Sequence, residues 1–110
     1  MPRRDLLSPV QRTALLALPD DEGELIRRYP FSSRDMALVQ QRRGDPNRFG
    51  FAVHLCYFRF PGQILGAGES PDARLTRLVA RQLGIDPDVW SEYAQRDQTR
   101  REHLQLIIDA

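Results

Sequence analysis

Lysine is absent from this 110-residue sequence, and cysteine and histidine are scarce. All 16 basic residues are arginine, whose planar guanidinium suits paired contacts to carboxylates and phosphates. A GC-rich genome would produce the same bias without selection for binding. Cys56 stands alone, which excludes a disulfide within the chain and favours a reducing cytoplasm.

Long hydrophobic runs are also missing. The longest one, FAVHLCYF, is short and is interrupted by His54. The first residues, MPRRDLLSPVQ, lack the apolar stretch of a signal peptide, so we expect neither secretion nor a membrane span. The last residues, HLQLIIDA, stop among apolar residues without a glycine or asparagine that would close a helix. We interpret the chain as a fragment of a longer protein.

The sequence also lacks an excess of charge of one sign. The 16 bases and 15 acids nearly cancel, leaving a formal charge of +1. Any site for a polyanion must therefore be local. The length and the 41% content of hydrophobic residues predict a single folded domain over residues 1–110.

Proline and small polar residues mark helix starts along the whole chain. They predict an all-α, compact domain of about six or seven short helices. The expected helices begin near Ser8, Asp20, Ser32, Asp45, Ser70, Asp86 and Thr99. FAVHLCYFRF could also alternate as a strand, but the upstream Asp45–Pro46 start favours a helix.

The segment 36–57 predicts a helix-turn-helix-like pair, in which the turn RGDP joins two helices. In that motif the first residues of the second helix meet the bases of DNA. Asn47 and Arg48 occupy this position, and we expect them to contact bases or backbone. Arg42 and Arg43 are expected to bind phosphate. His54, on the same helical face as Asn47 and Gly50, is a lesser candidate for a groove contact.

A second group of candidate phosphate contacts lies near the end of the chain: Arg96, Arg100 and Arg101. Glu92 with Arg96 and Asp97 with Arg101 have the spacing of ion pairs along a helix, which also gives a purely structural explanation of the charges. Arg100 has no acid four residues away and, with Arg96 and His103, is expected to form a basic edge. Arg3 and Arg4 are candidates for an arm that enters a minor groove.

Catalytic and metal chemistry find little support in this sequence. His54 and Cys56 are two residues apart, so on a helix they face different directions and cannot easily share a metal. Most acids mark helix starts, where they favour the helix dipole. The segment RFGFAV has a weak similarity to an RNA-recognition strand. We therefore predict no active site, no metal and no cofactor.

Three segments carry a family resemblance: RRGDPNRFGFAVHLCYFRFPG, ARQLGI and EYAQRDQTRREHLQLI. In this order and spacing they resemble the amino-terminal region of transposases of the Tn three family of replicative transposons, from about Leu6 to the end. The resemblance implies a bacterial, non-catalytic DNA-binding region that recognises terminal inverted repeats, with strand cleavage in a distant domain.

Its implied partners are double-stranded DNA, other domains of the same transposase and a possible second subunit. Two other functions stay open. One is a helical assembly module with an apolar patch at Leu106 and Ile107. The other is a free-standing repressor with the same helix pair.

Overall fold

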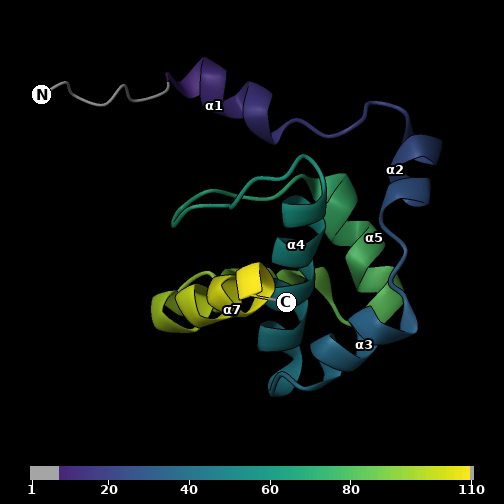
Figure 1. Ribbon diagram of the computed structural model, residues 1–110, viewed down its shortest axis with the longest axis vertical. Helices are drawn as coiled ribbons and strands as arrows, with labels where there is room; N and C mark the ends of the chain where they lie inside the picture. The colour runs from purple at the N-terminus through teal and green to yellow at the C-terminus, as the bar shows by residue number, and fades with distance from the viewer. Residues whose placement is uncertain (1–7, 110) are drawn as a thin grey trace, which may run out of the picture.

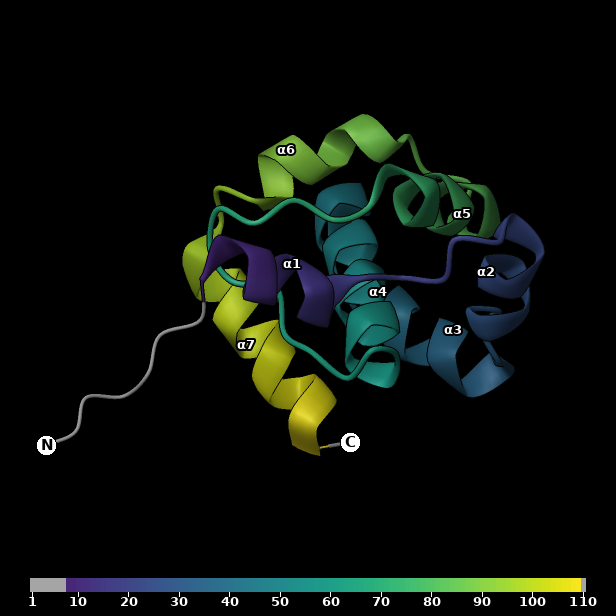
Figure 2. The ribbon, with the colours of Figure 1, turned by 90° about the horizontal axis from the view of Figure 1, so that it is seen from above.

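Helix α4 (Gly44–Arg59) runs through the middle of the molecule. This is seen in the computed structural model, which describes residues 8–109 (Figures 1 and 2). These residues form helices and no strand, so the all-α prediction is confirmed. The other helices are α1 (Pro9–Leu16), α2 (Glu22–Arg28), α3 (Ser33–Gln40), α5 (Ala73–Leu83), the 3-10 turn η1 (Pro87–Val89), α6 (Trp90–Tyr93) and α7 (Asp97–Asp109).

The central position of α4 follows from its composition. All residues from Phe49 to Tyr57 are buried, and α3, α5, α6 and α7 pack against the helix from different sides (Figure 2). A helix that is apolar all round must be enclosed by other elements. The helix predicted as one half of a DNA-reading pair is therefore the core of this domain.

Local signals set the starts of α1 and α3 as expected. The side chains of Ser8 and Ser32 cap α1 and α3 in reciprocal capping boxes with Gln11 and Asp35. The start predicted near Ser70 is wrong, because the side chain of Asp72 caps α5, which begins at Ala73. The last helix does not begin near Thr99 as expected, because α7 already begins at Asp97 and Thr99 lies inside its first turn.

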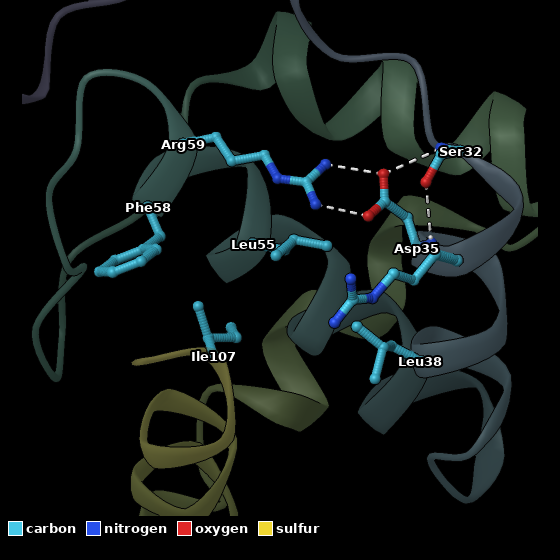
Figure 3. A pocket seen from close by; sticks show the side chains of 8 residues that line it. Ser32, Asp35, Leu38, Leu55, Phe58, Arg59 and Ile107 are labelled. Carbon is cyan, nitrogen blue, oxygen red and sulfur yellow. Dashed lines mark hydrogen bonds and ion pairs between the residues drawn. The ribbon is translucent and has the colours of Figure 1, made fainter. Parts of the chain in front are cut away.

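An ion pair between Asp35 and Arg59 joins the start of α3 to the end of α4 (Figure 3). The two-pronged hydrogen bond from Arg59 and the contacts with Ser32 hold the pKa of the buried Asp35 carboxyl at about 2, although burial opposes this shift. Beside the pair, α3, α4 and α7 line a cavity of about 370 Å³ that opens to the surface, with Leu55, Phe58 and Ile107 among its lining residues.

Helix α1 has no buried residue, although Leu16 packs against the core, and its polar anchor is the Arg12 side chain. The Arg12 guanidinium donates two hydrogen bonds of 2.8 Å to the Glu69 carboxylate and a third to the carbonyl of Ile64. These contacts fix α1 on the loop between α4 and α5, and the bond from Arg12 lowers the pKa of Glu69 to about 2. Within residues 8–109, no helix has both the length and the apolar character needed to cross a membrane.

Candidate nucleic-acid interface

The arginines of the described region fall into two groups. Eight form ion pairs with carboxylates. Within residues 8–109, six others have no carboxylate at salt-bridge distance: Arg34, Arg42, Arg43, Arg48, Arg77 and Arg81. Three of these six lie within residues 42–48, at the turn from α3 to α4. Unneutralised positive charge is therefore concentrated where the sequence predicted a DNA contact.

The three arginines of this turn are held differently. Arg48 donates to the carbonyl oxygens of Arg42 at 3.0 Å and Gln40 at 3.2 Å, and thereby satisfies backbone acceptors that the end of α3 leaves unpaired. The Arg42 guanidinium lies 5.1 Å from the centre of the Phe51 ring, a cation–π distance. Arg42 and Arg48 are partly exposed, and Arg43 is exposed.

A hydrogen bond of 2.9 Å from Arg96 to the Oδ1 of Asn47 brings the second candidate group to the first one. Arg96 lies in the turn between α6 and α7, and its other terminal nitrogen pairs with Glu92 at 2.9 Å. The predicted pair of Glu92 and Arg96 is thus confirmed. The start of α4 and the start of α7 form one surface, although Asn47 and Arg96 are 49 residues apart.

Asp97 binds both of the remaining candidates. Its carboxylate accepts hydrogen bonds from Arg101, four residues later, as predicted. It also accepts a hydrogen bond from Arg100, three residues later. The Arg100 side chain is only 15% exposed, whereas that of Arg101 is 64% exposed. Of these two, Arg101 is the side chain that a large polyanion can reach.

Gly50 explains how α6 and α4 approach so closely. A Cβ atom at this position would lie 2.2 Å from ring carbons of Tyr93. Gly50 lies three residues after Asn47, and Tyr93 lies three residues before Arg96. The contact between Gly50 and Tyr93 therefore places the side chains of Asn47 and Arg96 next to each other. The ring of Tyr93 fills the space beside Gly50, so this position leaves no room for a DNA backbone.

His54 is also misplaced by the sequence interpretation. It is 1% exposed, and its ring lies 5.9 Å from the rings of Trp90 and Tyr93, so it cannot contact a groove. Neither ring nitrogen has a hydrogen-bond partner within residues 8–109. Burial and, secondarily, the nearby charge of Arg100 lower the pKa of His54 to about 4.

His103 belongs to the core as well, not to a basic edge. It is 5% exposed, its Nδ1 lies 2.9 Å from the hydroxyl of Tyr93, and its ring packs edge-on against Phe51. Burial lowers the pKa of His103 to about 4, and the charge of Arg42 acts in the same direction. The rings of Phe51, Tyr93 and His103 pack together beneath Arg42. The sequence did not predict this cluster, because its members come from α4, α6 and α7.

The two helices predicted for the pair correspond to α3 and α4, but α4 is buried from Phe49 to Tyr57, and only its first turn and its last residues reach the surface. A helix enclosed on all sides cannot lie along a major groove. The candidates Arg3 and Arg4 lie outside the described residues. At the other end, Leu106 is 45% exposed, whereas Ile107 is 3% exposed, so the predicted apolar patch is correct only in part.

Comparison with known proteins assigns the chain to a family. A family model described as a domain of unknown function (DUF4158) matches residues 6–110. The chain belongs to this family. The match covers all helices of the DUF4158 domain described above, including both arginine groups.

Relatives of this DUF4158 domain are transposases. It is 58% identical to part of the transposase for transposon Tn3926 of Escherichia coli and 55% identical to part of that for Tn21 of the same species, over 94% of the chain in each case. Identity to part of the transposase for Tn501 of Pseudomonas aeruginosa is 50% over 97% of the chain. The chain spans about one tenth of the length of these relatives. The resemblance to transposases predicted from the sequence is confirmed, and the domain is a region that such transposases share.

Proposed function

We propose that this DUF4158 domain is a DNA-binding module that recognises the terminal inverted repeats of a transposon. The observation that carries the proposal is the arginine surface, which we define as Arg42, Arg43, Asn47, Arg48, Arg96, Arg100 and Arg101. Three of its members lack a carboxylate partner within residues 8–109, in a chain whose total charge is close to zero. The transposase relatives make duplex DNA the appropriate polyanion.

The fold restricts how such binding would work. Because α4 is buried from Phe49 to Tyr57, contact with DNA would come from its first turn and the adjoining turns, not from a helix that lies in the groove. Arg43 and Arg101, the most exposed members, would bind phosphates, whose released counterions drive association at low salt. Asn47, at the start of α4, is placed for a more selective contact.

The proposed role is a non-catalytic one within a longer transposase in the cytoplasm. Cleavage and joining of strands would then belong to other regions of the protein. The domain would bring a transposon end to those regions and contact them through its other faces.

Binding of the domain to a duplex carrying the terminal inverted repeat of Tn3926 or Tn21, measured by fluorescence anisotropy, tests this function. We expect tighter binding than to a scrambled duplex and a steep loss of affinity as salt rises. Replacing Arg43 with alanine should weaken binding to both duplexes and lower the salt slope by about 1. Arg81→Ala is the matched control and should change neither quantity. Arg81, on α5, is likewise exposed and has no carboxylate partner within residues 8–109. Equal and salt-independent binding to both duplexes would refute the proposal.

Assembly is the second candidate, and one observation favours it. Phe58, which lines the cavity between α3, α4 and α7, is 38% exposed, and Leu106 and Ile108 on α7 are 45% and 48% exposed. Exposed apolar side chains that lie close together often form part of a protein–protein interface. The molecular mass in solution, measured with and without DNA, separates this function from the first one.

A further inference from the structure

The amide of Asn47 has only one chemically possible orientation. Its partner is Nη1 of Arg96, at 2.9 Å, and a guanidinium has donors but no acceptor. The carbonyl oxygen of the amide must therefore face Arg96, and the NH2 group must face away from it. Amide orientations are often ambiguous in protein structures, but an arginine partner removes the ambiguity.

The outward NH2 group is open to solvent. Within residues 8–109, Nδ2 of Asn47 has no hydrogen-bond partner. The buried side-chain nitrogens without a partner in the same region are those of His54. An unpaired Nδ2 outside that set must reach the surface, where it presents two N–H donors among the arginines.

Arg96 is itself fixed on both sides. Its second terminal nitrogen is bound to Glu92, its backbone N–H donates to the carbonyl of Tyr93 at 2.8 Å, and its carbonyl accepts from the N–H of Arg100 at 2.9 Å. The backbone of the turn and a carboxylate thus hold the guanidinium in place. The hydrogen bond to Arg96 therefore holds the Asn47 amide in one orientation before any ligand binds.

We propose that Arg96 is a positioning residue that locks the Asn47 amide with its donors outward, so that Asn47 binds a hydrogen-bond acceptor of DNA. DNA offers acceptors of this kind on its bases, among them the N7 atom of a purine in the major groove, and on its phosphates. The inference rests on the proposed function, because it names the chemistry of one contact at the same surface. It assigns Arg96 an indirect role, whereas the sequence analysis treated it as a phosphate ligand.

Modified duplexes test the contact one DNA position at a time. Substitution of single purines by their 7-deaza analogues removes N7, and single methylphosphonates remove a phosphate oxygen and its charge. We expect one position at which the modification weakens wild-type binding about tenfold, the size of a hydrogen bond lost from a buried contact. A 7-deaza position identifies a base contact, and a methylphosphonate position identifies a phosphate contact.

Variants assign that position to Asn47. Asn47→Asp keeps an oxygen for Arg96 but replaces the outward donor with an acceptor, so it should abolish the sensitivity at that one position while the melting temperature is preserved. Arg96→Ala, which frees the amide to rotate, should reduce the same sensitivity, and Arg96→Lys should restore part of it. Arg101→Ala also removes one positive charge, but Arg101 bonds to Asp97 and not to Asn47. This variant should bind every duplex more weakly and still lose affinity when the one sensitive position is modified.

The outcomes distinguish the two levels of the proposal. If the wild-type domain binds no duplex selectively, the proposed function fails and the inference fails with it. If the wild-type domain binds selectively but Asn47→Asp remains sensitive at the same position, the Asn47 contact is overturned alone. If Asn47→Asp loses the sensitivity but Arg96→Ala behaves as Arg101→Ala does, the positioning role of Arg96 is overturned.

Discussion

Replacing Gly50 with alanine is expected to lower the free energy of unfolding by about 3 kcal/mol, the upper range for an overpacked core. The new Cβ atom would lie 2.2 Å from ring carbons of Tyr93, a side chain that is itself fully buried. The ring cannot give way without disturbing its contact with His103 at 2.9 Å. Urea denaturation followed by circular dichroism measures the effect.

Gly23→Ala is the matched control for this substitution. Gly23 is an exposed residue of α2, where alanine is the better helix former, and the nearest atom to a new Cβ is an Asp21 carboxylate oxygen at 3.2 Å. We expect Gly23→Ala to leave stability equal or raise it by up to about 1 kcal/mol. If Gly50→Ala were as stable as the wild type, α6 would not pack on α4 as described here, and Arg96 would not meet Asn47.

Acid should destabilise the domain in the window between pH 6.5 and pH 4. His54 is neutral when folded because its pKa is lowered from 6.5 to about 4, whereas in the unfolded chain it binds a proton near pH 6.5. Its contribution to stability is therefore complete above pH 6.5 and is lost as the pH falls to 4. A shift of this size corresponds to about 3 kcal/mol. His103 titrates in the same direction and adds to the loss.

His54→Phe separates the histidines from the carboxylates. The variant should unfold with a weaker dependence on pH between 6.5 and 4, because one of the two buried histidines is gone. Asp35 and Glu69 have pKa values of about 2, below their usual range of about 4, so their contributions are lost only at lower pH. Thermal unfolding at a series of pH values provides the measurement. An identical pH profile for the variant and the wild type would contradict the burial of His54.

The helices could be predicted because their signals are local. Ser8 and Ser32 form the expected capping boxes, and Gly84 closes α5 in the left-handed conformation that favours glycine. The start of α7 was misplaced because Thr99, with Glu102 three residues later, resembles a cap, whereas the helix already begins at Asp97.

The arrangement of the candidate site was predictable only in part. The arginines of residues 42–48 and the pair of Glu92 and Arg96 follow from spacing along the chain. The bond between Asn47 and Arg96 has no local signal, because it depends on how α6 packs against α4. The misplacement of His54 came from treating α4 as a helix with one exposed face. Its apolar residues occur on every side, which is typical of an enclosed helix.

Nuclear magnetic resonance provides the most direct test of the arginine surface. Backbone amide shifts of the domain would be followed while a duplex carrying a terminal inverted repeat is added. We expect the largest changes in residues 42–48 and 96–101, which the bond between Asn47 and Arg96 joins, and little change around Arg77 and Arg81 on α5. Changes centred on α5, or on the cavity between α3, α4 and α7, would place the DNA on another face and contradict the account.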